Sequence, residues 1–154
     1  MARFPYAAVK RNLLDSIQNR ADEYSIDLMH QAKQAHWNVK GPSSIALHKL
    51  FDDVFDAAVE YTDLLAERVV ELGGTAEGRI HIATKRSALK EYPLQMTGER
   101  DHVEALSSAL GVFGSGMRRD RPADELGDKG RADIFTEVSR GVDKYLWFVE
   151  AHLG

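Results

Sequence analysis

Five side chains that could bind a metal ion fall between positions 36 and 67 of the sequence. They are His36, His48, Asp52, Asp63 and Glu67. The last four form two pairs with a spacing of four residues, which makes the members of each pair neighbours on a helix surface. At 3.6 residues per turn, all four lie within an arc of about 100°. Two imidazoles and three carboxylates suit iron, manganese or zinc, and no thiolate is present to favour copper(I).

The two pairs lie too far apart to bind one ion from a single straight helix. His48 and Glu67 are separated by 67 − 48 = 19 residues, which is about 28 Å at 1.5 Å per residue. A second copy of the helix, antiparallel about a two-fold axis, would bring the first pair of one chain against the second pair of the other. We expect this axis between Ala57 and Ala58, whose small side chains would allow close approach. The pattern therefore predicts two identical metal sites per dimer.

His36 can join the same site because a turn follows it. Gly41-Pro42-Ser43 interrupts the helical pattern, so His36 and His48 would lie at a similar height in an antiparallel helical hairpin. The alternative is a solvated charged face, since His-x-x-x-Asp and Asp-x-x-x-Glu pairs are common on exposed helices. The common stripe and His36 favour a metal site, but the spacing alone does not choose the metal.

Four long helices are expected to position these residues, because apolar side chains recur in steps of three and four. Ser43 or Ser44 is expected as the N-cap of the second helix, and Gly73-Gly74 as its C-terminal stop. Residues 75–96 are too many for a simple bundle turn and predict a long crossover containing a short helix. The four helices are expected at about residues 10–38, 43–73, 97–120 and 122–152.

Three glycines are unusual in the third expected helix. Gly111, Gly114 and Gly116 each cost about 1 kcal/mol relative to alanine in a helix interior. A close contact with another helix and local flexibility are the two explanations. Because no strand precedes this run, it is not a phosphate-binding loop.

Several short motifs resemble the Dps proteins, the DNA-protection-during-starvation or mini-ferritin branch of the ferritin-like superfamily. The five metal-ligand candidates match that family in type and spacing, and the likeness covers nearly the whole chain. The other matching motifs are His36-Trp37-Asn38, Gly41-Pro42, Ala66-Glu67-Arg68, Leu72-Gly73-Gly74, Glu91-Tyr92-Pro93-Leu94, Asp101-His102, Ala132-Asp133-Ile134 and Asp143-Lys144-Tyr145-Leu146-Trp147-Phe148.

This resemblance implies an all-α, ferritin-like four-helix bundle with a long crossover between helices 2 and 3, assembled as a hollow shell of twelve subunits. It also implies a ferroxidase that oxidises Fe(II), preferably with hydrogen peroxide, and stores Fe(III) mineral inside the shell. The expected location is the bacterial cytoplasm or nucleoid. The metal ligands would also be the catalytic residues. One subunit would supply His36, His48 and Asp52, and its mate would supply Asp63 and Glu67.

Two further roles follow from the same resemblance. Trp37 would lie beside the iron centre and intercept oxidising equivalents, whereas its ordinary role would be packing. Asp128 and Asp133, within an acidic cluster early in the last expected helix, would line an iron-entry pore at a three-fold axis. The alternative for these acids is that carboxylates in a first turn offset the helix dipole.

Composition limits the other possibilities. The 154 residues suit one domain, residues 1–154, and contain no cysteine for a disulfide framework or a thiolate site. The N-terminal segment lacks a long apolar run, and no stretch approaches the length of a membrane span, so we expect neither a secretory signal nor a membrane partner.

DNA binding is expected to be weak or absent. The net charge is −4, and twelve copies would carry 12 × −4 = −48, which does not attract DNA over the whole surface. The N-terminal segment contains only Arg3, Lys10 and Arg11 as basic residues, whereas phosphate neutralisation needs several, although twelve weak patches could add avidity. The alternative functions are a nucleoid DNA-binding protective shell with little metal chemistry, and a structural helical oligomer with a zinc site.

Overall fold

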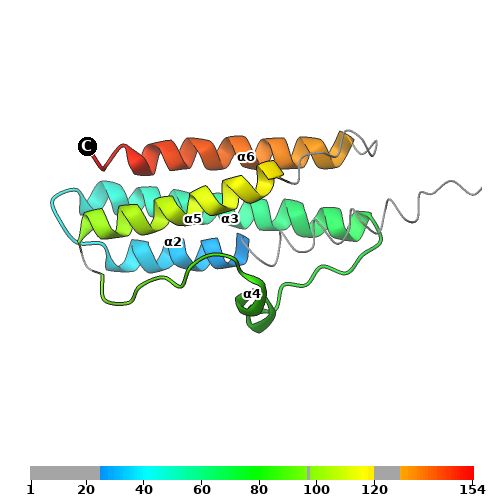
Figure 1. The fold of residues 1–154 in the computed structure, drawn as a ribbon, viewed down its shortest axis with the longest axis horizontal. Coiled ribbons are helices and arrows are strands. Elements are labelled where there is room, and N and C mark those ends of the chain that lie inside the picture. Colours follow the sequence, from blue (N-terminus) through cyan, green and yellow to red (C-terminus); the bar gives the residue numbers. More distant parts are fainter. Residues whose placement is uncertain (1–24, 97, 120–128) are drawn as a thin grey trace, which may run out of the picture.

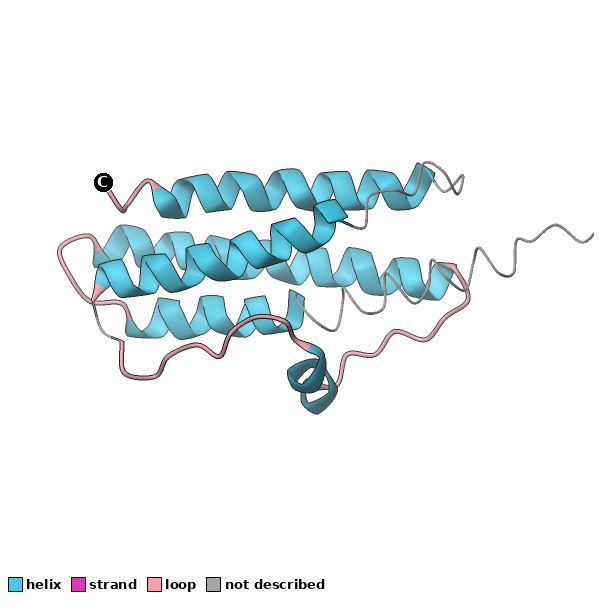
Figure 2. Cartoon of the chain, in the orientation of Figure 1, coloured by secondary structure: helices cyan, strands magenta, loops and turns pink. Residues whose placement is uncertain are grey.

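The computed structural model describes residues 25–96, 98–119 and 129–154. Within these residues the chain is helical and contains no β-strand, and four long helices lie side by side (Figures 1 and 2). A fifth, short helix interrupts the crossover. The helices are α2 (Ile26–Asn38), α3 (Ser44–Glu71), α4 (Ile80–Arg86), α5 (Glu99–Arg119) and α6 (Lys129–Glu150). The predicted all-α bundle with a long crossover is confirmed.

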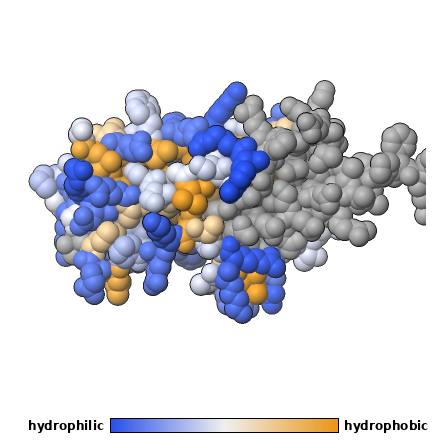
Figure 3. Space-filling model, viewed as in Figure 1, coloured by the Kyte–Doolittle hydropathy of each residue, from blue (hydrophilic) through white to orange (hydrophobic). Residues whose placement is uncertain are grey.

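The helices pack as two antiparallel pairs. The strongest contacts join α2 to α3 and α5 to α6, while α3 also packs on α6 and α2 on α5. The crossover runs back along the bundle from the end of α3 to the start of α5, and α4 contacts α2 on the way (Figure 1). On the face that carries α4 and α5, polar side chains surround smaller apolar areas (Figure 3). No helix in the described part of the chain is both long and apolar enough to cross a membrane.

The predicted helix ends agree closely with the structure. The first long helix ends at Asn38 as expected, and its expected start near residue 10 lies outside the described residues. At the end of α3, Gly73 has a φ of 85°. The Gly74 N–H donates to the Val69 carbonyl at 2.9 Å and the Gly73 N–H to the Val70 carbonyl at 2.8 Å. These two hydrogen bonds form a Schellman motif, which explains why the helix ends at the predicted glycines.

The start of α3 is held by another helix rather than by its own cap. Ser43 occupies the predicted N-cap position, but its side chain makes no capping hydrogen bond. Its N–H instead donates to the Glu99 carboxylate, at the start of α5. Gly41, with a φ of 148°, leaves the space that Glu99 fills, because a Cβ there would lie 2.5 Å from the Glu99 Cδ. α5 therefore fixes the turn between α2 and α3.

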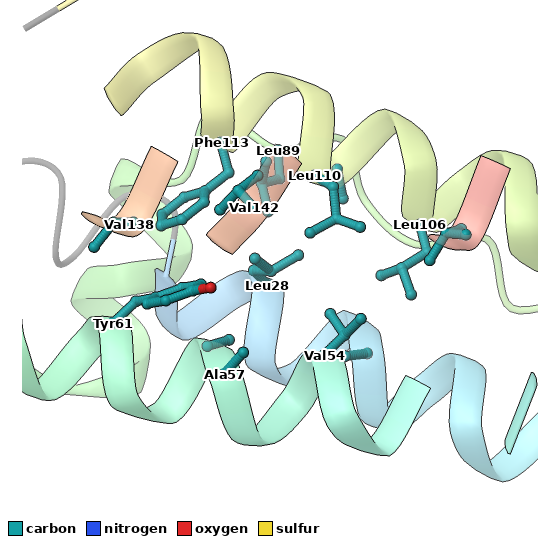
Figure 4. Close-up of a cluster of buried hydrophobic side chains, with 14 of the residues drawn as sticks. Leu28, Val54, Ala57, Tyr61, Leu89, Leu106, Leu110, Phe113, Val138 and Val142 are labelled. Atoms are coloured by element: carbon teal, nitrogen blue, oxygen red, sulfur yellow. The ribbon is translucent and has the colours of Figure 1, made fainter. Parts of the chain in front are cut away.

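The apolar stripes of the four helices meet in one core (Figure 4). Its largest fully buried side chains include Phe51, Phe113 and Phe135, one from each of three helices. Gly114 belongs to a close contact of α5 with α6, because a Cβ there would lie 3.2 Å from the Val142 Cγ1. Gly111 has no such explanation, since a Cβ there would meet nothing within 4 Å.

The glycine of α6 that faces Tyr61 provides a test of this packing. A Cβ added at Gly141 would overlap the Tyr61 hydroxyl and lie 2.9 Å from its Cζ, and the Tyr61 ring is buried and stacked on Phe113. Gly141→Ala should therefore lower the free energy of unfolding by ~1–3 kcal/mol, the usual cost of overpacking. Urea titration of the assembled protein measures this change.

The matched control is Gly111→Ala in α5. It adds the same methyl group where no atom lies within 4 Å, so it should leave stability unchanged or raise it by up to ~1 kcal/mol through helix propensity. Equal effects of the two substitutions would contradict the close contact at Gly141.

Candidate metal centre

The two predicted histidine ligands face each other across the turn between α2 and α3. His36 lies in the last turn of α2 and His48 in the second turn of α3. Their rings are stacked, with centroids 3.6 Å apart and planes inclined by 22°. The prediction that the helical hairpin brings them to the same height is confirmed.

Reciprocal hydrogen bonds orient both rings. The His36 Nδ1 lies 2.8 Å from the His48 carbonyl oxygen, and the His48 Nδ1 lies 2.8 Å from the His36 carbonyl oxygen. A carbonyl oxygen only accepts, so each Nδ1 carries a proton and donates it. In the neutral rings each Nε2 then has a free lone pair, which is the arrangement used by metal-binding histidines.

Asp52 is the third predicted ligand at this end of α3, one helical turn after His48. Its Oδ1 lies 3.9 Å from the His36 Nδ1 and forms an ion pair with the Lys33 ammonium. The hydrogen bond from Lys33 is the largest influence on the pKa of Asp52 and lowers it, against the smaller opposing effect of burial. Because the pKa is lowered in the folded chain, this contact stabilises the fold above the ordinary pKa of aspartate. The stabilisation is lost as the pH falls through the lowered value.

Lys33 lies beside the candidate ligand Asp52, and the sequence patterns did not single it out. Its ammonium lies 4.6 Å from the centre of the Phe55 ring, which helps to hold it beside Asp52. The available signal was its position three residues before His36, which places both on neighbouring parts of the α2 surface. Lys33 occupies the position where a cation bound by Asp52 would lie.

Asp63 and Glu67 lie in the second half of α3 and are exposed. Along a straight helix, His48 and Glu67 are about 28 Å apart. Asp63 and Glu67 therefore cannot share a metal ion with the histidines of the same chain. In residues 25–96, 98–119 and 129–154 of one chain, no three His, Cys, Asp or Glu side chains are arranged to hold a metal ion. The single chain stacks His36 on His48 and places Asp52 next to them, but these three side chains do not form a metal-holding group by themselves, and the other two acids lie apart.

The expectation that Ala57 and Ala58 face a partner helix and allow its close approach is wrong. Ala57 is 8% exposed and Ala58 0%, and Ala57 points into the buried cluster with Val54 and Tyr61 (Figure 4). Each residue turns the helix by 100°, so positions midway in number between the ligand pairs need not share their face. The middle of the outer face instead carries the half-buried Phe55 and Val59, which is 40% exposed.

The remaining predicted residues have different outcomes. Trp37 is 67% exposed, so packing in the core of its own bundle does not explain it. Asp133 is exposed near the start of α6, whereas Asp128 lies outside the described residues.

The chain resembles known proteins along most of its length. A model of the ferritin-like domain matches residues 19–154, which with the observed fold defines a ferritin-like protein. The DNA protection during starvation protein of Agrobacterium fabrum is 45% identical over 129 residues, covering 83% of this chain and 80% of that protein. The protein of the same name from Mycolicibacterium smegmatis is 30% identical over 146 residues, covering 92% of this chain and 77% of that protein.

Solved structures agree with these relatives. Dps from Microbacterium arborescens in the high iron form is 30% identical, with a TM-score of 0.83 over 99% of this chain and 97% of that one. The tetragonal form of Mycobacterium smegmatis Dps is 26% identical, with a TM-score of 0.89 over 95% of this chain and 88% of that one. The chain belongs to the Dps family, as the motifs predicted. This membership supports a protective function related to iron.

Removal of the Lys33 ammonium tests its competition with a metal cation. Lys33→Met should raise the pKa of Asp52 towards its ordinary value, because the lysine hydrogen bond is the largest cause of the shift. It should also tighten Co(II) binding by up to about fivefold, since a partly exposed ion pair is worth at most ~1 kcal/mol. NMR titration of the Asp52 carboxyl group and calorimetric Co(II) titration measure the two effects.

Lys49→Met is the matched control, because Lys49 is an exposed lysine of α3 beside His48 in the sequence. It removes the same charge and should change neither quantity. If both variants tighten Co(II) binding equally, general electrostatics rather than the Lys33–Asp52 contact controls the affinity.

Proposed function

We propose that this protein is a ferroxidase and iron-storage protein that oxidises Fe(II), preferably with hydrogen peroxide, at sites shared between subunits. The main support is the division of ligand candidates along α3, with two imidazoles and Asp52 at one end and Asp63 and Glu67 at the other. A two-fold partner would bring the two ends together. A solved relative that is described in a high iron form adds support.

The ligand types suit this chemistry. The two Nε2 lone pairs bind Fe(II), and the carboxylates favour the higher charge of Fe(III), so oxidation is favoured over release. Hydrogen peroxide accepts two electrons and each Fe(II) supplies one. Two Fe(II), one peroxide and two protons therefore yield two Fe(III) and two water molecules. Consuming both reagents together prevents them from forming hydroxyl radical.

The proposed assembly is a hollow shell of twelve subunits built from two-fold dimers, in the cytoplasm or nucleoid of a bacterium. The apolar side chains on the outer face of α3, Phe55 and Val59, suit burial against a second copy. Trp37 is exposed in the single chain and follows the ligand His36. We propose that it lies beside the iron centre and intercepts oxidising equivalents there. Trp37→Phe should then increase oxidative damage to the shell during iron oxidation.

The second candidate function is a DNA-binding protective shell with little metal chemistry. The names of the relatives, DNA protection during starvation proteins, favour it, whereas the net charge of −4 opposes it. We propose that DNA binding is weak or absent. A gel shift showing tight, salt-dependent binding at physiological salt, without peroxide-dependent iron oxidation, would support this second function instead.

Mixed shells test whether each site uses two subunits. His48→Ala and Glu67→Ala should each abolish peroxide-dependent Fe(II) oxidation in pure shells. When equal amounts of the two variants are co-expressed, a site has an intact histidine end with probability one half and an intact acidic end with probability one half. About one quarter of the sites should then be complete, so the mixed shells should regain about one quarter of the wild-type rate. Stopped-flow absorbance of Fe(III) measures this rate.

Two controls support the interpretation of the mixed shells. Asp53→Ala removes an exposed carboxylate next to Asp52 in sequence but 100° away around the helix, and it should keep the full rate. Mixed shells that remain as inactive as each pure variant would show that ligands are not shared in this way. Metal binding without any oxidation would favour a structural zinc site.

We also propose that Asp128 and Asp133 line the iron-entry pore. The double substitution Asp128→Asn with Asp133→Asn removes six charges around a three-fold axis (2 × 3 = 6 carboxylates), so uptake of Fe(II) should slow, most strongly at low salt. Stopped-flow measurement of Fe(II) oxidation inside the shell follows the entry. Glu150→Gln at the other end of α6 is the control, and an unchanged rate in the double variant would exclude the pore role.

A further inference from the structure

A partly exposed tyrosine and a buried histidine form a hydrogen-bonded pair beside the end of the bundle that carries His36 and His48. Tyr92 lies in the crossover just before Pro93, and His102 lies in the first turns of α5. The Tyr92 Oη is 2.6 Å from the His102 Nδ1, and the rings are stacked with centroids 5.9 Å apart. His102 is only 1% exposed. Neither residue belongs to the proposed iron site.

The protonation states of this pair favour a phenol that donates to an imidazole. Burial raises the pKa of Tyr92 above its ordinary value, so its hydroxyl keeps its proton at neutral pH. Burial is also the largest influence on His102 and lowers its pKa, so the ring is neutral. The short bond therefore joins a neutral donor and a neutral acceptor.

A purely structural hydrogen bond leaves one feature unexplained. The other ring nitrogen of His102, Nε2, is buried and makes no hydrogen bond of good geometry, although the Met96 and Asn38 backbone acts on the ring. A buried unpaired polar atom costs about 1–3 kcal/mol, which a serine or asparagine partner for Tyr92 would avoid. Unlike a serine or asparagine side chain, an imidazole can also accept the phenolic proton. The Tyr92 Oη and the His102 Nδ1 lie within the distance required for transfer to a general base.

Neighbouring groups partly offset the effect of burial on His102, although its pKa stays lowered. Hydrogen bonding to the backbone of Met96 and Asn38 acts to raise the pKa of His102, against the effect of burial. The negative charge of Asp101 acts in the same direction. Asn38 is also the last residue of α2, two positions after His36. The pair therefore lies next to the end of the helix that carries the proposed iron ligand.

Tyr92 is also open to small reagents. It is partly exposed and borders a surface cavity of about 140 Å³ that Gln31, Leu89 and Pro93 line as well. Oxidation of a phenol makes its proton strongly acidic, and a buried charge is costly unless it is compensated. A base already bound to the hydroxyl removes this barrier, because electron and proton leave together.

We propose that Tyr92 and His102 form a redox-active pair that quenches hydroxyl radical by proton-coupled electron transfer. Tyr92 gives one electron to the radical, which becomes hydroxide, and passes its phenolic proton to the His102 Nδ1. The products are a neutral tyrosyl radical and an imidazolium. Fe(II) then returns one electron to the tyrosyl radical and becomes Fe(III), while the proton goes back to the phenolate oxygen. The radical would arise where a single Fe(II) reduces peroxide to hydroxide and hydroxyl radical, in place of two Fe(II) reducing it to water. This source rests on the proposed ferroxidase function, which brings both reagents into the shell.

The test uses assembled protein with two sources of one-electron oxidant and electron paramagnetic resonance of frozen samples. One arm mixes Fe(II) with hydrogen peroxide. The other arm contains no iron and uses a ruthenium tris-bipyridyl complex with persulfate under light. Wild-type protein should form a tyrosyl radical in both arms, with the high-field signature of a hydrogen bond from a positively charged donor.

Three variants identify the radical. Tyr92→Phe keeps the ring and its packing but removes the hydroxyl, so this signal should be lost in both arms. His102→Gln should remove the charged hydrogen-bond signature and slow radical formation. Tyr61→Phe is the control, because it removes the same hydroxyl from a tyrosine that stacks on Phe113 rather than on an imidazole. It should leave the signal unchanged.

The two arms separate failure of this pair from failure of the ferroxidase. A light-driven signal that persists unchanged in Tyr92→Phe overturns the redox pair, whatever iron and peroxide do. A signal that depends on Tyr92 but keeps its signature in His102→Gln also overturns it, because the proton would then go elsewhere. A light-driven signal that requires both residues supports the pair. If iron and peroxide then give neither radical nor Fe(III), the ferroxidase proposal alone fails.

Discussion

The hydrogen bonds exchanged between His36 and His48 are the interaction on which the candidate site depends. Each ring is held by the backbone of the other helix, so the position of either nitrogen depends on how α2 meets α3. That meeting is controlled from a third helix, because Glu99 of α5 binds the Ser43 N–H and fills the space left by Gly41. Two imidazoles are thus oriented by main-chain geometry rather than by flexible second-layer side chains.

The outer face of α3 carries both apolar side chains and an ion pair. Phe55 lies between the two ligand pairs and also supports the Lys33 ammonium beside Asp52. An ammonium at a carboxylate keeps a partly exposed anion neutralised until another cation replaces it. The Lys33–Asp52 ion pair can therefore lie next to the apolar side chains of this face. An unpaired carboxylate there would make burial of the face against a second subunit more costly.

Much of the architecture could be predicted from the sequence because it depends on local patterns. Periodic apolar residues predicted the helices, and Gly73-Gly74 predicted the end of α3, since each signal acts within one or two turns. The similar height of His36 and His48 could be predicted because one turn joins the two helices, whereas the stacking of their rings was not predicted. The role of Ala57 and Ala58 was wrong because distance along the sequence was used where rotation around the helix decides the face.

Other features depend on contacts between distant segments and could not be read from spacing. The Lys33–Asp52 ion pair links two helices whose relative rotation the sequence does not specify. Glu99 holds a turn 56 residues earlier in the chain. The matching motifs Tyr92-Pro93 and Asp101-His102 were recognised only as a likeness, and the short bond between their side chains emerged from the packing of the crossover on α5.

The length of α3 has a consequence for when iron chemistry can begin. Its 28 residues hold the two ligand pairs well apart, so on the proposed arrangement a newly made, unpaired subunit has no complete centre. Oxidation would start only after subunits meet, when a compartment for insoluble ferric product is already forming. The spacing of the two ligand pairs would then ensure that subunits assemble before they oxidise iron, and unassembled monomers would be inactive.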